Sequence, residues 1–280
     1  MGTPILQVQD LRVGYEEKKQ GFSLFAPKSY NWAVNGVSFD LAHGETLGIV
    51  GESGCGKSTL AHAITRLLPA QSGSVFYNGQ DLLALSAKQM LKVRSEIQMV
   101  FQDPLASLNP RLTAGQIIAE PMKTHQPSAS RNDVKNRVGE LMEMVGLSRR
   151  MINRYPHEFS GGQCQRIGIA RALITNPKLL VCDEPVSALD VSVQAQVVNL
   201  LMDLKRELGL SMLFIAHDLS VVKHISDRIM VLKFGNIAEL GEAKQVIHQP
   251  NDAYTRELVA AVPIPDPKAE RARLAARLTA

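Results

Sequence analysis

The chain has 280 residues with a formal net charge of +4 and 45% hydrophobic residues, enough to bury one domain with an inserted subdomain. No apolar run approaches the roughly 18 residues of a membrane-spanning helix, and the opening MGTPILQVQD lacks the pattern of a signal peptide, so we expect the chain to stay in the cytosol. Three widely spaced cysteines argue against a disulfide framework or a paired-cysteine metal site.

The first segment predicts β-structure that leads into a phosphate-binding loop. Alternating apolar residues in 5–15 and 34–51 predict short strands broken by turns, with the second pair of strands joined at His43 and Gly44. Residues 47–50 then run into a glycine-rich loop, and 57–68 predict a helix that Pro69 ends.

The middle of the chain, about 86–159, is methionine-rich and poor in strands. Apolar residues at helical spacing lie between Ser130 and Gly146, namely Val134, Val138, Leu141, Met142 and Val145. We interpret this region as an inserted helical subdomain, with the methionines as packing residues rather than ligands.

After Ser160 the sequence predicts alternating helices and strands. A helix starts near Gly162, a buried strand covers 179–182, and a long helix covers 191–208 and is closed by Gly209. A strand at 211–216 and a strand pair at 228–240 follow. This alternation favours a mostly parallel sheet with right-handed crossovers, formed by about 1–85 and 160–248.

Residues 250–280 predict a peripheral tail, richer in proline, alanine and charge. Its basic cluster consists of Lys268, Arg271, Arg273 and Arg277. We interpret this cluster as a solvated helix face and expect no nucleic-acid partner.

A nine-residue segment has the GxxxxGK[ST] pattern between a strand and a helix, and it consists of Gly51, Glu52, Ser53, Gly54, Cys55, Gly56, Lys57, Ser58 and Thr59. Its glycines let backbone N–H groups turn towards phosphate oxygens. Lys57 supplies positive charge to the β- and γ-phosphates, and Ser58 offers a hydroxyl to Mg²⁺. Cys55 lies beside Lys57 and a helix N-terminus, so we expect its thiol pKa to be lowered, and we expect alkylation to inhibit unless ATP protects.

A phosphate loop alone leaves kinases, GTPases, helicases and transporter ATPases open. The run LLVCDEP places two carboxylates, Asp183 and Glu184, at the end of a buried strand where a nucleotide's metal would lie. Asp183 suits the Mg²⁺ shell, and Glu184 suits the base that acts on the attacking water.

The motif FSGGQ, residues 159–163, then resembles the LSGGQ signature of the ABC transporter family. Ser160 and Gln163 have the spacing of a capping box, and Gly161 and Gly162 leave N–H groups accessible. The resemblance implies that this element caps the γ-phosphate of ATP held by an opposite subunit. It also implies a RecA-like P-loop NTPase core with an N-terminal antiparallel β subdomain, all within residues 1–265.

Further family elements occur in order along the chain. The resemblance implies that Gln102 contacts Mg²⁺ or the water, that His217 hydrogen-bonds the γ-phosphate, and that Asp190, in the segment 187–190, carries signals across the dimer. Tyr15 resembles the aromatic residue that stacks on adenine. Tyr30 and Trp32 are alternatives, because 16–30 looks like an insertion.

The resemblance narrows to the dipeptide, oligopeptide and nickel import group, through segments 101–111, 120–122 and 253–267. The chain is similar to the second ATPase of a heteromeric pair. This implies ATP and Mg²⁺ as cofactors. It implies as partners a homologous ATPase, two transmembrane permease subunits and an extracytoplasmic solute-binding protein, at the cytoplasmic face of the plasma membrane.

Three departures from the group leave the cargo open. Residues 251–255 replace the usual HPYT, Cys164 replaces an arginine after the signature, and a cysteine-rich tail is absent. Peptides are the favoured cargo, with nickel or another small solute as alternatives. A soluble ABC-type ATPase acting on ribosomes or nucleic acid would instead predict tandem cassettes, a long coiled coil or zinc-spaced cysteines.

Overall fold

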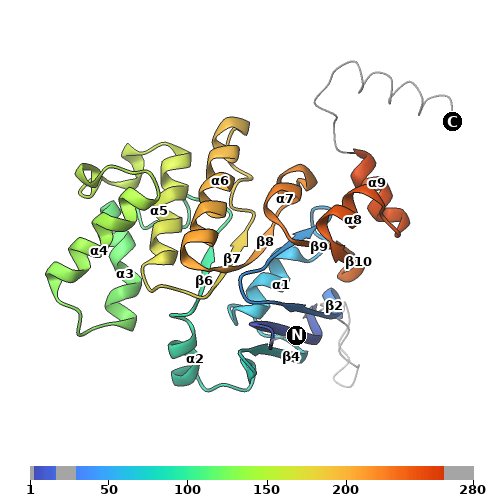
Figure 1. Cartoon of the computed structure of the whole chain (residues 1–280). Helices are drawn as coiled ribbons and strands as arrows, with labels where there is room; N and C mark the ends of the chain where they lie inside the picture. The colour runs from blue at the N-terminus through green and yellow to red at the C-terminus, as the bar shows by residue number, and fades with distance from the viewer. Residues whose placement is uncertain (1–2, 17–29, 262–280) are drawn as a thin grey trace, which may run out of the picture.

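The computed structural model describes residues 3–16 and 30–261 (Figure 1). Its strands are β1 (Leu6–Glu16), β2 (Tyr30–Leu41), β3 (Thr46–Val50), β4 (Ser72–Tyr77), β5 (Gln80–Asp81), β6 (Ile97–Val100), β7 (Leu179–Asp183), β8 (Ser211–Ile215), β9 (Arg228–Lys233) and β10 (Asn236–Glu242). Its α-helices are α1 (Lys57–Ile64), α2 (Ala87–Val93), α3 (Ala114–His125), α4 (Arg131–Met144), α5 (Gly161–Leu173), α6 (Val191–Leu208), α7 (Leu219–Ile225), α8 (Ala243–His248) and α9 (Ala253–Ala261). Two 3₁₀ helices cover Arg149–Met151 and Pro156–Glu158.

The larger sheet has the strand order β10-β9-β3-β8-β7-β6. Strands β9, β3, β8, β7 and β6 are parallel, and β10 pairs antiparallel with β9. The predicted mostly parallel sheet is therefore confirmed. Because βα crossovers place helices over a parallel sheet, its strands are buried on both faces and appear in the sequence as continuous apolar runs.

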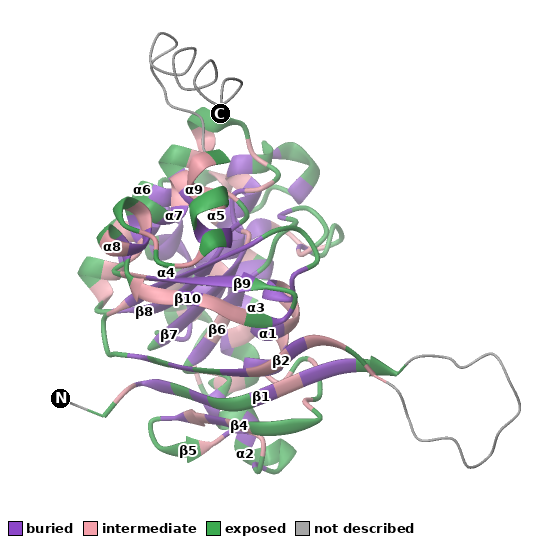
Figure 2. Ribbon diagram, turned by 90° about the vertical axis from the view of Figure 1, so that its right-hand side faces the viewer, coloured by how far each residue is buried: buried purple, intermediate pink, exposed green. Residues whose placement is uncertain are grey.

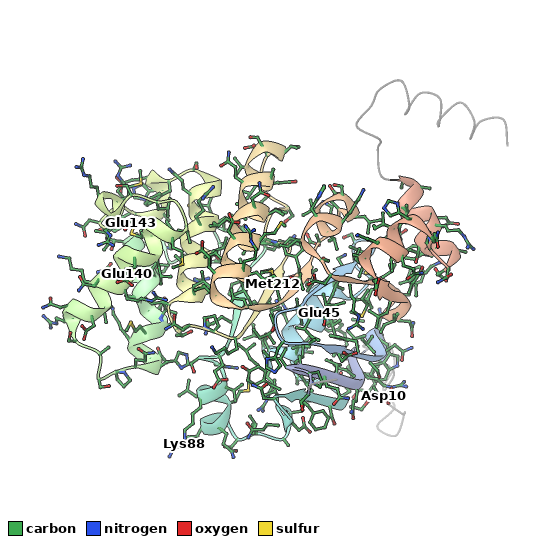
Figure 3. All side chains as sticks on the ribbon, viewed as in Figure 1. Asp10, Glu45, Lys88, Glu140, Glu143 and Met212 are labelled. Atoms are coloured by element: carbon green, nitrogen blue, oxygen red, sulfur yellow. The ribbon has the colours of Figure 1, made fainter. Side chains whose placement is uncertain are left out.

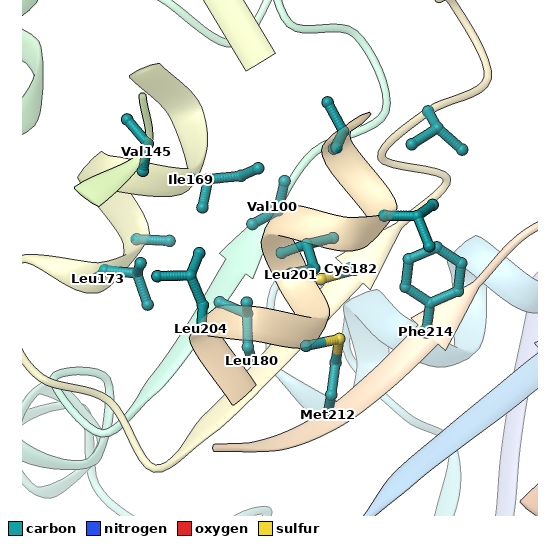
Figure 4. Packing of buried hydrophobic residues seen from close by; sticks show 14 of the residues in the cluster. Val100, Val145, Ile169, Leu173, Leu180, Cys182, Leu201, Leu204, Met212 and Phe214 are labelled. Atoms are coloured by element: carbon teal, nitrogen blue, oxygen red, sulfur yellow. The ribbon is translucent and has the colours of Figure 1, made fainter. Parts of the chain in front are cut away.

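Each face of this sheet belongs to its own hydrophobic cluster. On β8, Met212 and Phe214 join the cluster shared with α3 to α8, whereas Leu213 and Ile215 join the cluster shared with α1 and the smaller sheet. Figure 4 shows Met212, Phe214 and Leu180 packed together with Leu201 of α6. The burial map in Figure 2 accordingly shows buried residues along the strands of the larger sheet. This arrangement holds the strand ends, and the loops that follow them, in fixed positions.

The smaller sheet has the order β2-β1-β4-β5 and is antiparallel throughout. The predicted N-terminal antiparallel sheet is therefore confirmed. The strands on either side of His43 and Gly44 are β2 and β3, and they lie in different sheets, since β3 pairs in parallel with β8 and β9. The sequence pattern could not show this, because a short buried strand does not reveal its partners.

The helical part of the molecule lies at one end of the larger sheet, where α3 and α4 pack near α5, opposite α8 and α9 (Figure 1). On α4, Glu140 and Glu143 project outward (Figure 3), and Glu143 pairs with Arg149 at 2.8 Å between Oε1 and Nε. The range 86–159 assigned to this subdomain also contains β6, which pairs with β7 in the larger sheet. The helical part thus begins after β6.

Helix ends follow local chemistry. The predicted helix 191–208 is confirmed as α6, and Gly209 closes it in the left-handed conformation with φ 63°. In contrast, α1 ends at Ile64 rather than at the predicted Leu68, because Arg66 adopts φ 54°. The N–H groups of Arg66 and Leu67 then donate to the carbonyls of Ala63 and His62, which is the Schellman arrangement of a helix C-terminus.

Within residues 3–16 and 30–261, no helix combines the length and the hydropathy needed to cross a bilayer. The expected insertion at 16–30 falls almost wholly on residues outside the described ranges, and so does the basic cluster of the predicted tail. The start of that tail, by contrast, forms α9 and packs on β10.

Candidate nucleotide-binding site

A cavity of about 490 Å³ opens beside the loop between β3 and α1. Its lining comes from the phosphate loop, the β1–β2 pair, the β9–β10 turn and the ends of β6 and β7. The lining residues are Tyr15, Asn31, Trp32, Ala33, Ser53, Gly54, Gly56, Lys57, Ser58, Thr59, Gln102, Glu184, Phe234 and Gly235. Nine of these fourteen were predicted as site residues from the sequence, so sequence and geometry indicate the same place.

The phosphate loop requires glycine where it meets α1. Gly56 has φ 106°, and a β-carbon there would lie 1.9 Å from the carbonyl oxygen of Ala33. Gly56 is also the N-cap of α1, and no side chain caps this helix. The first N–H groups of α1 are therefore left for another acceptor, which is the arrangement that binds phosphate.

Lys57 is the charged group of this loop. Its Nζ donates to the carbonyl of Gly51 at 2.8 Å and to the carbonyl of Glu52 at 2.9 Å, and the residue is only 4% exposed. The loop backbone thus holds the ammonium group close to the cavity that Lys57 lines.

Asp183 ends β7 facing the first turn of α1. Its Oδ1 accepts a 2.8 Å hydrogen bond from Ser58, and its Oδ2 lies 3.6 Å from Nε2 of His62. Burial raises the pKa of this carboxyl above its usual value, and the Ser58 hydrogen bond partly opposes the rise. Sequence reasoning missed His62, although a signal existed: Ser58 and His62 are four residues apart and share one face of α1.

Two other predicted catalytic residues, Gln102 and His217, lie beside Glu184. Nε2 of Gln102 donates to Glu184 Oε2 at 3.0 Å, and Nδ1 of His217 lies 3.5 Å from the same oxygen. These three residues follow β6, β7 and β8, which are neighbours in the parallel sheet, and carboxyl ends of parallel strands are where open α/β sheets bind ligands.

The backbone at Glu184 is strained. Its φ is 44°, a region that non-glycine residues rarely adopt, and its N–H donates to the carbonyl of Ile215 at 3.0 Å. The carbonyl of Glu184 accepts from the hydroxyl of Ser187 at 3.1 Å. Such conformations persist where surrounding contacts hold them, and they concentrate at functional sites.

The signature segment forms the predicted capping box. Ser160 is the N-cap of α5: its hydroxyl accepts from the Gln163 N–H at 3.3 Å, and its own N–H donates to Oε1 of Gln163 at 3.0 Å. Gly162 packs closely on α6, since a β-carbon there would lie 2.4 Å from Cγ1 of Val193. None of the residues 160–163 lines the cavity described above.

Asp190 caps the next helix. Its Oδ1 accepts from the Ser192 hydroxyl at 2.7 Å and from the Val193 N–H at 3.0 Å. These hydrogen bonds, the first above all, lower the pKa of Asp190. Asp190 does not line the cavity either, so within one chain it lies outside the nucleotide site.

Two of the three candidate adenine-stacking aromatics line the cavity, Tyr15 and Trp32. Tyr15 is 54% exposed, whereas Trp32 lies against Gly14, where a β-carbon would be 2.9 Å from Cε3 of the indole. Tyr30 packs against Trp32 with ring centroids 5.3 Å apart and is absent from the lining.

Sequence reasoning missed the β9–β10 turn. Phe234 is 75% exposed at the cavity, and the Gly235 N–H donates to the carbonyl of Cys55 at 3.0 Å. This turn follows the phosphate loop by about 180 residues in the sequence and reaches it only because β9 pairs with β3. A hairpin turn by itself carries no functional signal.

The expected lowering of the Cys55 pKa is wrong. Cys55 is 4% exposed, and this burial raises the pKa of its thiol, with the positive charge of Lys57 opposing the rise only in part. The sequence showed the neighbouring charge and the helix end, but it could not show the burial.

A family model described as "ABC transporter" matches residues 34–187. The chain belongs to the ABC transporter family. This ABC ATPase is 60% identical over 267 residues to the oligopeptide transport ATP-binding protein OppF of Salmonella typhimurium, covering 95% of this chain and 80% of that protein. It is 53% identical to OppF of Bacillus subtilis (89% and 82% covered) and 48% identical to the dipeptide transport ATP-binding protein DppF of Escherichia coli (98% and 82% covered).

Solved structures give the same result. A dimeric post-hydrolysis state of the ATP-binding cassette MJ0796, bound to ADP and Pi, superposes with a TM-score of 0.75 at 30% identity, over 85% of this chain and 98% of that one. The structure of cbiO1 from Clostridium perfringens, part of the ABC transporter complex cbiONQ, superposes with a TM-score of 0.74 at 27% identity, over 88% of this chain and 91% of that one. The chain is therefore an ABC ATPase that binds and hydrolyses ATP.

Proposed function

We propose that this ABC ATPase drives the import of oligopeptides or dipeptides. It works with a homologous second ATPase chain, two permease subunits and an extracytoplasmic solute-binding protein, at the cytoplasmic face of the plasma membrane. The proposed cargo is inferred from the sequence identity of 48–60%, over nearly the whole chain, to ATP-binding proteins of oligopeptide and dipeptide transport.

The phosphate loop and the start of α1 bind the phosphates. Lys57, whose ammonium group is held beside the cavity by the carbonyls of Gly51 and Glu52, supplies positive charge to the β- and γ-phosphates. The uncapped N–H groups of α1 add their partial positive charge. Tyr15 supplies the exposed ring on which adenine stacks.

Mg²⁺ fits the donors at this site. The Ser58 hydroxyl and the Asp183 carboxylate are oxygen ligands already 2.8 Å apart, and the Gln102 amide nitrogen is engaged by Glu184, which leaves its oxygen for a cation. No group of three or more His, Cys, Asp or Glu side chains in the described residues forms a metal cage, in keeping with a cation that takes further ligands from phosphates. When bound, Mg²⁺ neutralises phosphate charge.

Hydrolysis depends on Glu184. Its carboxylate accepts hydrogen bonds, so it orients the attacking water and takes its proton, while Gln102 and the strained backbone fix its position. We assign the donor to the γ-phosphate to His217, whose Nδ1 lies 3.5 Å from the same carboxylate.

The signature acts on the nucleotide of the other ATPase. Ser160 and the glycines after it begin a helix, as an anion site requires, yet they do not line the cavity of their own chain. ATP bound in the cavity of one chain therefore meets the signature of its mate, and Asp190 lies at the contact between the two. Because the γ-phosphate touches both halves, ATP favours the closed pair, and its cleavage allows the halves to separate.

A membrane partner docks beside Gln102. Phe101 and Leu105 are 37% and 55% exposed next to it, and exposed apolar side chains of this kind suit an interface. Motion of a docked permease then displaces Gln102 and, through its hydrogen bond, Glu184.

Reconstitution tests this proposal. The chain is purified with its permease and second ATPase, placed in lipid vesicles with the solute-binding protein, and given peptides of two to five residues or Ni²⁺ salts. We expect ATP-dependent uptake and stimulated ATPase activity with peptides. Uptake of nickel with no response to peptides would contradict the cargo, and recovery of ribosomes or nucleic acid without permease would contradict the transporter.

A further inference from the structure

The side chain of Tyr254 on helix α9 contacts the phosphate loop. The residue is 6% exposed, and its hydroxyl oxygen accepts a 3.2 Å hydrogen bond from the backbone N–H of Glu52. The two residues are 202 positions apart. No sequence motif places Tyr254 in the nucleotide site.

The N–H that Tyr254 engages belongs to the peptide unit between Gly51 and Glu52. The carbonyl of that same unit, the Gly51 oxygen, accepts the 2.8 Å hydrogen bond from Lys57. One peptide plane is thus held from both sides, by Tyr254 at its N–H and by Lys57 at its carbonyl. Because a peptide unit is planar, rotation at one group moves the other.

Tyr254 is itself held in place. Oδ1 of Asp252 accepts from the N–H groups of Tyr254 and Thr255 at 2.9 and 3.2 Å, which caps the start of α9. The Lys233 ammonium lies 4.4 Å from the centre of the Tyr254 ring, a cation–π contact. Lys233 directly precedes Phe234 in the turn that lines the cavity.

The start of α9 is anchored on β10 by Glu239, which is 8% exposed. Its carboxylate accepts from the N–H groups of Asn251 and Asp252 at 3.0 and 3.2 Å and from the Gln245 side chain at 3.3 Å. A buried carboxylate with three donors is well satisfied. Contacts therefore run without a break from the sheet, through the start of α9, to the phosphate loop.

We propose that Tyr254 is a positioning residue for nucleotide binding: it fixes the Gly51–Glu52 peptide and so preorganises the loop and Lys57 for the phosphates. The proposal rests on the nucleotide site proposed above. It extends that site to α9. The hydrogen bonds of Tyr254 and of the start of α9 involve none of Gln102, Glu184 and His217.

Tyr254→Phe tests the hydroxyl alone, because the ring and its contact with Lys233 remain. A partly buried N–H at Glu52 then lacks its acceptor, and we expect the ATP dissociation constant to rise by about threefold to tenfold. In the assembled complex KM for ATP should rise in step, while kcat stays within about twofold, because the groups around the attacked phosphate are intact.

Tyr77→Phe is the matched control. Tyr77, on β4 of the smaller sheet, is 4% exposed and does not line the cavity, and its hydroxyl donates to Glu96 at 2.9 Å. We expect this variant to lose stability while binding ATP like the parent. Asp252→Ala, which uncaps α9, should weaken ATP binding in the same direction, and the double variant with Tyr254→Phe should be less than additive because both act through one contact.

Equilibrium titration of the full-length chain with ATP, together with thermal unfolding of each variant, decides the matter. Unchanged affinity in Tyr254→Phe overturns the proposal. The proposal is also overturned if Tyr77→Phe loses as much ATP affinity as Tyr254→Phe at the same loss of stability, because weaker binding would then be a general result of destabilisation. If the parent chain itself fails to bind ATP, the nucleotide site is wrong, a result distinct from a parent and a Tyr254→Phe variant that bind equally.

Discussion

The amide nitrogen of Gln102 donates a 3.0 Å hydrogen bond to a carboxylate oxygen of Glu184, joining residues that follow neighbouring strands of the parallel sheet. In the proposed mechanism, Gln102 contacts a membrane partner as well as Glu184, and it thereby links docking to hydrolysis. The same mechanism makes the Glu184 carboxylate the group on which hydrolysis depends.

Glu184→Gln should lower kcat for ATP hydrolysis by about 10²–10⁴-fold, because an amide cannot accept the proton of the attacking water. ATP affinity should be kept, since Lys57 and the loop are unaltered. Phosphate release by the assembled complex measures the first and ATP titration the second. Glu207→Gln, at an exposed position of α6, is the control and should be neutral. Unchanged turnover in Glu184→Gln would show that another group is the base.

Gly162→Ala should destabilise the fold by about 1–3 kcal/mol, because the added β-carbon meets Cγ1 of Val193 at 2.4 Å and forces α5 from α6. Adding Val193→Ala should restore part of the loss. Gly168→Ala on the same helix has no atom within 4 Å of its new β-carbon and should be neutral or stabilising by up to about 1 kcal/mol. Urea unfolding compares the three, and equal midpoints for Gly162→Ala and the parent would refute the close contact.

Trp32 is the single tryptophan of the chain and lines the cavity, so ATP should change its fluorescence. Tyr15→Ala should move this titration to higher ATP concentration by about tenfold, the scale of one lost aromatic–base stack. Tyr15→Phe should titrate like the parent, because it keeps the ring. If Tyr15→Ala has no effect, the stacking role belongs to Trp32. In that case Trp32→Ala should weaken ATP binding, which calorimetry measures because this variant has no tryptophan fluorescence.

Alkylation of Cys55 should be slow near neutral pH. Burial raises the pKa of this thiol, so at fixed pH its thiolate fraction is smaller than that of an ordinary thiol, and the rate should climb as pH rises towards the raised pKa. Mass spectrometry of N-ethylmaleimide labelling at pH 7.5 and 9 measures the rate, with glutathione as reference and Cys55→Ser to identify the peptide. Labelling faster than glutathione at pH 7.5 would contradict the burial.

Much of the fold was predictable because its signals are local. The strand, loop and helix around Lys57, the helix closed by Gly209 and the capping box at Ser160 all depend on residues within a few positions of one another. The features that escaped prediction depend on tertiary pairing. The separation of β2 and β3 into two sheets, and the place of β6 in the larger sheet, are set by partners distant in sequence.

The same distinction holds at the site. Glu184 could be named from the buried strand before it, and Gln102 and His217 from the family resemblance; the adjacency of strand ends in the sheet brings the three together. Phe234 and Tyr254 reach the phosphate loop from about 180 and 200 residues away in sequence, through strand pairing and helix docking that no local pattern records. The pKa of Cys55 is raised rather than lowered as expected for a related reason, because burial is a property of the whole fold.

The central claim is that the triphosphate is held by Lys57 of one chain and Ser160 of its mate, and vanadate photocleavage measures this most directly. Orthovanadate trapped with ADP takes the place of the γ-phosphate and, on irradiation, cuts the backbone beside it. In the assembled complex we predict cleavage of this chain both at 54–57 and at 160–163. Cleavage at 160–163 should be lost when the mate's phosphate-loop lysine is replaced. Cleavage confined to the phosphate loop, in a complex that hydrolyses ATP at its normal rate, would contradict the account.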